Sequence, residues 1–137
     1  MTQESLTGSC LCGSVRYQIE GEGLVFYHCH CTRCRKSSGT GHASNLRVAP
    51  ETSLRWLQGE DLLKKYRVTE AERFYNLFCS NCGSPMPRAM PSIGAVVIPA
   101  GTLDTEPVMQ PQSRIFWDSR VEWSCSGDGL PVHAEYP

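Results

Sequence analysis

Short segments in which apolar and polar residues alternate recur along this chain, with turn residues between them. In the first of them Val15, Tyr17 and Ile19 alternate with polar residues and are followed by Gly21-Glu22-Gly23. An alternation of period two is typical of a strand with one buried face, and glycine is common in turns. We therefore predict a β-hairpin whose turn lies at Gly21–Gly23.

Similar short segments follow, whereas apolar residues spaced with the period of a helix are hard to find. The 12 glycines and 9 prolines fall mostly between these segments, which indicates frequent turns. One exception is Thr32–Ser38, which is polar and basic and is followed by Gly39, so we predict a helical turn there. We predict a mainly β fold of short antiparallel sheets, with further strands at Leu24–His28, Ala43–Val48, Ser53–Leu57, Leu62–Val68, Arg73–Phe78, Pro85–Ala89, Ala95–Ile98 and Ile115–Trp117.

The C-terminal part of the chain differs from the rest. Residues Gly101–Gln112 contain two prolines and few aromatic side chains, and we expect a surface loop. The tail Ile115–Pro137 carries Phe116, Trp117, Trp123 and Tyr136, which is a large apolar area for a free terminus. We expect the tail to pack back onto one domain that spans residues 1–137.

Composition and charge exclude several functional classes. Of the 137 residues 40% are hydrophobic and 20% charged, as in one globular domain, and the net charge is −1. This charge argues against nucleic acid as a partner. The longest apolar run, Ala95–Ile98, is far shorter than the roughly 20 residues of a membrane helix, and no secretory signal is recognised. We expect no membrane association and a cytoplasmic location.

The eight cysteines are the strongest chemical feature of the sequence. Stable disulfides are rare in the reducing cytosol, so closely spaced cysteines there indicate metal ligands. Pairs spaced C-x-C or C-x-x-C place two sulfurs on one tight turn, and soft thiolates select zinc or an iron–sulfur cluster. The cysteines form two pairs, one triplet and one single residue: Cys10 and Cys12, Cys79 and Cys82, Cys29, Cys31 and Cys34, and Cys125.

Two pairs can close a four-sulfur structural site, whereas a triplet leaves one coordination position free, as in catalytic zinc sites. Spacing leaves two questions open. Cys10 and Cys12 could instead share an ion with two cysteines of the triplet. A second, merely structural zinc at the triplet could be closed by a further ligand, for which the candidates are His28, His30, His42 and Cys125.

Three motifs carry a resemblance to a known family. The run from Cys29 to Gly39 reads CHCTRCRKSSG; it is preceded by GSCLCGSV at residues 8–15 and followed by FCSNCGS at residues 78–84. Together they resemble the glutathione-dependent formaldehyde-activating enzyme family, which shares its domain with centromere protein V. The segments IFWDSR at 115–120, DGLP at 128–131 and EYP at 135–137 are also similar to that family's C-terminal end.

The resemblance implies a β-tent fold with two zinc ions. The structural zinc would be held by Cys10, Cys12, Cys79 and Cys82, and the second by Cys29, Cys31 and Cys34. It also implies a carbon–sulfur lyase or synthase activity of the S-(hydroxymethyl)glutathione synthase type, with glutathione and formaldehyde or another small aldehyde as substrates. The chain departs from the family at Arg114, where relatives often have histidine, and in having Cys125.

The charge of the second site suggests roles for its neighbours. Zinc with three thiolates carries a net charge of −1, and a fourth thiolate from a substrate would make it −2, which favours nearby cations. We expect Arg33, Arg35 and Lys36 to contact glutathione, and Ser37, Ser38 and Gly39 could donate to its carboxylates. His30 is the candidate proton donor, with His28, His42 and water as alternatives.

Two other functional classes compete with an enzyme. The first is a zinc-stabilised binding module without catalysis, which a closed second site would favour. The second is a thiol redox protein, which is disfavoured because the C-x-x-C motifs lack the βαβ pattern of thioredoxin-like domains.

Overall fold

The computed structural model describes residues 2–125 and 129–137, and it confirms a mainly β fold. A seven-stranded sheet and a separate hairpin contain all strands of the described chain, and every strand pair is antiparallel except β2 with β9. The elements are β1 (Thr2–Ser9), β2 (Arg16–Cys29), α1 (Thr32–Ser38), β3 (Ala43–Ala49), β4 (Leu54–Gln58), β5 (Leu63–Arg67), β6 (Tyr75–Cys79), β7 (Arg88–Met90), β8 (Ala95–Pro99) and β9 (Ser113–Ile115), with short 3-10 turns between some of them.

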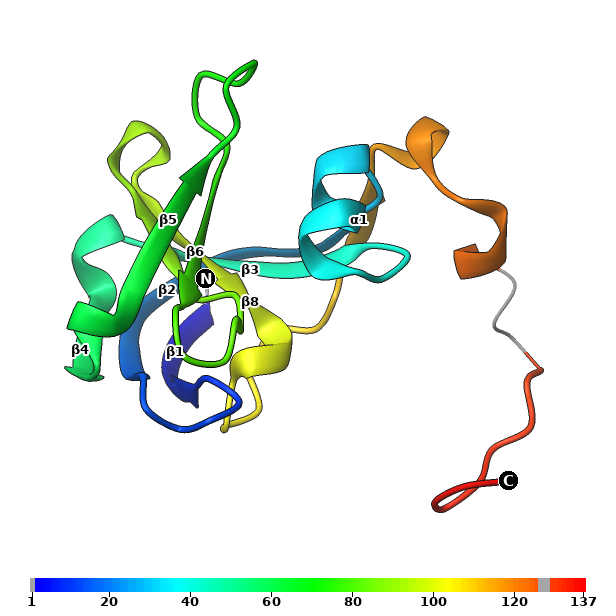
Figure 1. The fold of residues 1–137 in the computed structure, drawn as a ribbon, viewed down its shortest axis with the longest axis horizontal. Coiled ribbons are helices and arrows are strands. Elements are labelled where there is room, and N and C mark those ends of the chain that lie inside the picture. Colours follow the sequence, from blue (N-terminus) through cyan, green and yellow to red (C-terminus); the bar gives the residue numbers. More distant parts are fainter. Residues whose placement is uncertain (1, 126–128) are drawn as a thin grey trace.

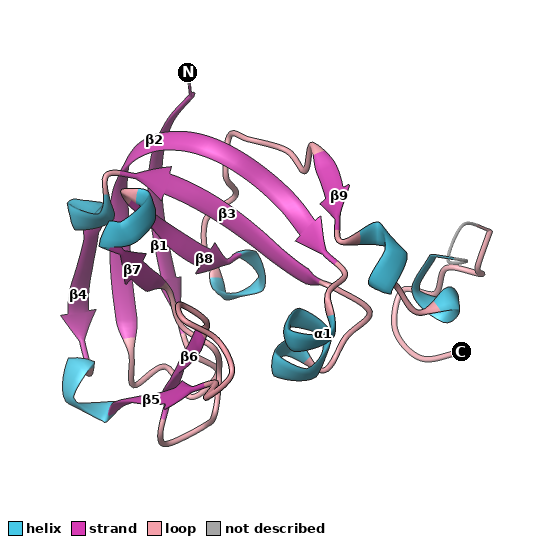
Figure 2. Cartoon of the chain, turned by 90° about the horizontal axis from the view of Figure 1, so that it is seen from above, coloured by secondary structure: helices cyan, strands magenta, loops and turns pink. Residues whose placement is uncertain are grey.

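Strand β2 organises the sheet. It pairs with β1, β3, β4 and β9, and the sheet continues from β3 through β8 to β7. Figure 2 shows β2 and β3 side by side in opposite directions: β2 runs toward α1, which follows it directly, and β3 runs back from α1. In Figure 1 the hairpin of β5 and β6 rises from the sheet as a separate layer.

The predicted hairpin turn at Gly21–Gly23 is wrong, because β2 continues through these residues to Cys29. Both glycines are buried, and a Cβ atom on Gly23 would lie 2.6 Å from Met109 Sδ. The glycines therefore permit close packing of neighbouring segments. They also lie next to a register shift between Gly23 and Val25.

The alternation of apolar and polar residues does not predict strand β1. Its buried side holds Glu4, Leu6 and Gly8, so the inward positions are not uniformly apolar. Glu4 is fully buried, and its carboxylate accepts hydrogen bonds from the backbone N–H groups of Val108 and Met109. A buried carboxylate needs such donors to offset the free energy that it loses on leaving water.

The other predicted segments are confirmed with small shifts at most ends. Two differ more: β7 begins at Arg88 rather than Pro85, and β9 ends at Ile115, after which Trp117–Ser119 forms a 3-10 turn. Proline cannot donate to a strand ladder, which explains the later start of β7. The helical turn α1 is confirmed, and it ends at Gly39 in the left-handed conformation that glycine adopts readily.

The side chains of β3 divide between the two faces of the sheet. Leu46 and Val48 face the main hydrophobic core, while Asn45 and Arg47 alternate with them and face the other side. A second, smaller cluster of buried residues contains Tyr27, Cys29 and Cys34. Cys10 and Cys79 belong to the main core. The two cysteine groups therefore sit in different parts of the fold.

The expected packing of the tail holds for its first residues, since Ile115 packs against the smaller cluster and the Trp117 ring lies 5.2 Å from the His30 ring, but it is wrong for the side chains near the C-terminus. Figure 1 shows the chain after β9 leading away from the sheet. Trp123 is 67% exposed, Val132 95% and Tyr136 93%. After β9 the described tail forms only short 3-10 turns and irregular backbone, so no strand pairing attaches it to the sheet. No helix within residues 2–125 and 129–137 has the length and apolar character needed to cross a membrane.

Candidate metal centre

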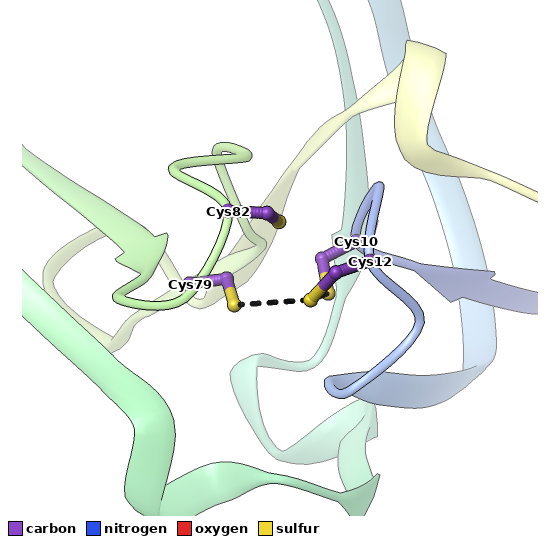
Figure 3. A group of neighbouring side chains, drawn as sticks. All are labelled: Cys10, Cys12, Cys79 and Cys82. Atoms are coloured by element: carbon purple, nitrogen blue, oxygen red, sulfur yellow. Dashed lines mark hydrogen bonds between the residues drawn. The ribbon is translucent and has the colours of Figure 1, made fainter.

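Two similar turns bring four cysteines together, as Figure 3 shows. One turn joins β1 to β2 and carries Cys10 and Cys12; the other follows β6 and carries Cys79 and Cys82. In each turn the first cysteine donates its backbone N–H to the carbonyl five residues later, at 3.0 Å. Gly13 and Gly83, each directly after the second cysteine, have φ values of 78° and 81°. Glycine is the residue that adopts this conformation at little cost, so it lets each turn close.

The sulfur separations in this group fit a tetrahedral ion. The four Sγ atoms lie within 4.8 Å of one another. Cys10 Sγ is 3.5 Å from Cys12 Sγ, which is 4.0 Å from Cys79 Sγ. A tetrahedral zinc with bonds of about 2.3 Å would set its sulfurs about 3.8 Å apart. The structure therefore brings together the predicted set of Cys10, Cys12, Cys79 and Cys82 rather than a mixed set with the triplet.

Hydrogen bonds around this group favour thiolates. The hydrogen bonds of Ser84 lower the pKa of Cys82 to about 5. Hydrogen bonds from Ser14 and Asn81 lower the pKa of Cys12 to about 7. Burial raises the pKa of Cys79, so this sulfur depends most on a bound cation to stay ionised.

The cysteine triplet lies where β2 passes into α1. Cys29 is the last residue of β2, Cys31 is the N-cap of α1, and Cys34 lies in its first turn. Cys31 Sγ accepts a hydrogen bond of 3.3 Å from the backbone N–H of Cys34, as an N-cap oxygen would. The end of a strand and a capped helical turn thus fix the three sulfurs within 4.8 Å of one another.

The triplet has an open side. Among the side chains of residues 2–124 and 129–137 no histidine, aspartate, glutamate or further cysteine joins the three sulfurs as a fourth ligand. The side chain of Cys125, one of the sequence candidates for that position, lies outside what the structure describes. A hydrogen bond from Cys34 lowers the pKa of Cys29 to about 6, and the same bond together with burial raises the pKa of Cys34.

Three histidines form a cluster of their own, which does not join the three sulfurs. The rings of His28 and His30 both pack near His42, with centroids 4.2 and 5.1 Å away. His30 is fully buried, and Arg114 Nη1 donates to its Nε2 at 3.1 Å. Burial lowers the pKa of His28 and of His30, so both rings favour the neutral form. The structure does not bring the predicted proton donor His30 to the triplet.

A cavity of about 830 Å³ opens beside the triplet and is lined by all three cysteines. Of the three basic residues of α1, Arg33 lines this cavity, whereas Arg35 and Lys36 do not. Arg35 Nη2 instead lies 3.4 Å from Thr32 Oγ1, and the Lys36 side chain is exposed. The hydroxyls of Ser37 and Ser38 donate to the Cys34 carbonyl, so they are not free to donate to a glutathione carboxylate.

Two cavity residues that the sequence did not reveal are Arg47 and Arg88. They belong to β3 and β7 and both pair with Val97 of β8, so the three residues form one row across the sheet. Arg47 Nε donates to Tyr27 Oη at 3.2 Å, and Arg88 Nη1 donates to the Tyr75 carbonyl at 2.8 Å. No motif marks these arginines, because only the strand pairing brings them together.

Neither arginine is paired with a carboxylate in the described part of the chain. Burial lowers the pKa of Arg88, and the charges that act on it come from Tyr75, Cys34, Tyr27 and Arg47. The positive charge of Arg47 in turn contributes to the lowered pKa of Cys29. Glu70 and Glu72 line the same cavity from the loop between β5 and β6. Half-buried cations without anionic partners favour an anionic ligand.

A smaller cavity of about 310 Å³ lies next to the larger one. The two cavities share Cys34, Asn45, Phe74 and Arg88, so the cavities meet at these residues. His42 lines the smaller cavity; His28 and His30 line neither.

Known proteins resemble this chain in sequence and in fold. The family model "Glutathione-dependent formaldehyde-activating enzyme" matches residues 5–119. A Halomonas elongata protein with the provisional name glutathione-dependent formaldehyde-activating enzyme is 27% identical over 128 aligned positions, which cover 86% of this chain and 78% of the relative. A crystal structure of a Rhodobacter sphaeroides protein has a similar fold, with a TM-score of 0.55 and 22% identity over 80% of this chain and 98% of that one.

Proposed function

Because the chain belongs to the family of glutathione-dependent formaldehyde-activating enzymes, we propose that it joins glutathione to formaldehyde or another small aldehyde at the cysteine triplet. The reaction is of the S-(hydroxymethyl)glutathione synthase type, and its reverse is the cleavage of a carbon–sulfur bond. The observation that carries the proposal is the open side of Cys29, Cys31 and Cys34, which faces the cavity of about 830 Å³.

The two cysteine groups have different roles in this proposal. Cys10, Cys12, Cys79 and Cys82 hold a structural zinc with four sulfurs, and the triplet holds a second zinc with three. A zinc with a free position supplies a place where an incoming thiol loses its proton below its usual pKa of about 8.5. Free cysteines at both groups fit a cytoplasmic protein.

The addition itself is simple in its balance of atoms. The thiol gives up its proton, its sulfur forms a bond to the aldehyde carbon, and the carbonyl π bond breaks. The aldehyde oxygen then takes up a proton, so that thiol and aldehyde combine with nothing lost. The chain's own contribution is to bind both reactants and to hold the sulfur as a thiolate beside cationic groups.

Arg47 and Arg88 provide those cationic groups. They line the same cavity as the three sulfurs, and Arg33 adds a third guanidinium from α1. Guanidinium groups bind carboxylates through paired hydrogen bonds, and glutathione carries two carboxylates. The proposed glutathione contacts are therefore Arg47, Arg88 and Arg33. Arg35 and Lys36 are no longer among them.

Thiol binding by the zinc-loaded protein tests the proposal. Calorimetric titration is performed with glutathione and with S-methylglutathione, which has the same carboxylates but no free thiol. Glutathione is expected to bind at least about tenfold more tightly, because it alone can offer a thiolate to the open position. Equal affinities, or no binding of either ligand, would overturn the proposed site.

Substitution of Arg47 by methionine is expected to weaken glutathione binding by about tenfold or more, since a hydrogen bond to a charged group contributes about 1.5–3 kcal/mol. Methionine keeps much of the aliphatic stem of arginine, so the loss reports mainly on charge. The matched control is Lys36→Met on the exposed face of α1, which we expect to bind like the wild type. An equal loss in both variants would mean that the row across the sheet has no special part in binding.

A further inference from the structure

The smaller cavity provides a second approach to the proposed reaction site. It is bounded by the C-terminal half of α1, the first residues of β3 and the middle of β6. Of the three cysteines in the triplet only Cys34 lines it, whereas all three line the larger cavity. Two reactants could therefore reach the same group of sulfurs from two cavities.

The two cavities differ in charge. Arg33, Arg47 and Arg73 line only the larger one, and Glu70 and Glu72 lie there as well. In the described lining of the smaller cavity no lysine, aspartate or glutamate occurs, and Arg88 is shared where the two cavities meet. The larger cavity thus suits a charged molecule such as glutathione, and the smaller one suits a neutral molecule.

The lining of the smaller cavity is rich in groups that hydrogen-bond without a full charge. The amide residues Asn45 and Asn76 belong to this lining, and so do Ser44 and Thr40, whose hydroxyls are already hydrogen-bonded to the His28 ring and to the His42 carbonyl and keep only acceptor capacity. Amides both donate and accept, and the two hydroxyls accept, which matches the hydroxyl groups of a polyol or sugar-like molecule. Ala43, Leu77 and Met86 supply apolar surface for its carbon atoms.

The volume of the smaller cavity exceeds what formaldehyde needs. Formaldehyde has two heavy atoms, and one water molecule occupies about 30 Å³ in the liquid. The cavity measures about 310 Å³, at the lower end of the range for small-molecule sites. A molecule with several carbon atoms would fill it better.

We infer that the smaller cavity binds the aldehyde, and that its preferred substrate is a neutral, hydroxylated aldehyde of several carbons. This inference rests on the proposed function and specifies its second substrate. The thiolate sulfur comes from the larger cavity and forms the bond to the carbonyl carbon where the two cavities meet near Cys34. The carbonyl π bond breaks and its oxygen takes up the proton that the thiol released.

The test compares glyceraldehyde with formaldehyde, each with glutathione and zinc-loaded protein. Because formaldehyde is the more reactive aldehyde, every rate is divided by the uncatalysed rate. We expect the acceleration for glyceraldehyde to equal or exceed that for formaldehyde. The variant Asn76→Leu keeps the size of the side chain but removes its amide, and it should lower kcat/KM for glyceraldehyde by about tenfold. The kcat/KM for formaldehyde should change less than about twofold, because formaldehyde is too small to reach that amide.

The outcomes separate this inference from the proposed function. Acceleration confined to formaldehyde, or an equal loss for both aldehydes in Asn76→Leu, would overturn the assignment of the smaller cavity and leave the proposed function standing. No acceleration with either aldehyde would overturn both. Asn76→Ala, whose smaller side chain avoids crowding, is measured alongside, and both variants must keep the metal content and circular dichroism of the wild type.

Discussion

Replacement of Cys82 by serine is expected to leave a chain that no longer folds. Cys82 is only half-buried, so the packing lost with its sulfur is small. The proposed structural zinc, however, joins the β1–β2 turn to the turn after β6, and its ligands Cys12 and Cys79 lie 67 positions apart in sequence. Structural zinc contributes about 10–16 kcal/mol in small zinc domains, whereas whole domains are stable by only about 5–15 kcal/mol. Loss of this ion therefore exceeds what the remaining core can offset.

Circular dichroism and zinc content of the purified protein measure this effect. The matched control is Ser80→Ala, an exposed position on the same turn whose side chain belongs to neither cysteine group. We expect the control to behave as the wild type. A Cys82→Ser protein with a wild-type spectrum and full zinc content would show that the four-sulfur group is not a structural metal site.

Replacement of Cys31 by serine is expected to have the opposite pattern: a folded protein without activity. Serine is a good N-cap, so it can accept the hydrogen bond that Cys31 Sγ now accepts from the Cys34 N–H and keep α1 in place. The triplet loses a sulfur and with it the second zinc. The rate with glutathione and aldehyde should fall more than about 100-fold, to the uncatalysed background.

Three measurements on Cys31→Ser establish this pattern. Zinc content should fall to half of the wild-type value, while circular dichroism and the unfolding temperature stay close to it. Thr32→Ser, a neighbouring change on α1 that removes no sulfur, serves as the control. Unfolding of Cys31→Ser to the same extent as Cys82→Ser would contradict the division into a structural and a reactive site.

The sequence predicted the two cysteine pairs and the triplet because the spacing within each is local, whereas the joining of the two pairs followed only from the family resemblance. Each pair lies on one tight turn, and the glycine that closes it follows the second cysteine. Strand β1 could not be recognised in this way, because Glu4 and Gly8 occupy inward positions that usually hold apolar side chains. Glu4 is satisfied by Val108 and Met109, more than 100 residues away, so the signal for its burial is not local.

The surroundings of the triplet depend on strand pairing and were only partly predictable. The row of Arg47, Val97 and Arg88 requires the register of β3, β8 and β7, which no short motif encodes. The position of His30 depends on the same long-range packing, since it lies directly after β2 and its ring contacts Arg114 and Trp117 from the C-terminal part of the chain.

The error on the tail has a different cause. A large aromatic area in a terminus usually indicates packing, but Trp123 and Tyr136 remain mostly exposed. Aromatic residues near the end of β9 do become part of the candidate site, since Phe116 lines the larger cavity although it is 63% exposed. Composition therefore shows that the tail carries a large apolar area, but it does not show which of its side chains are buried.

The central claim is that the triplet accelerates the joining of a thiol and an aldehyde, and an exchange measurement at equilibrium tests it most directly. NMR exchange spectroscopy records the interconversion of glutathione and S-(hydroxymethyl)glutathione in the presence of formaldehyde, where the uncatalysed reaction is a constant background. We predict that the zinc-loaded wild type raises this exchange rate in proportion to its concentration, and that Cys31→Ser does not. An exchange rate unchanged by the wild type, or raised equally by Cys31→Ser, would contradict the account.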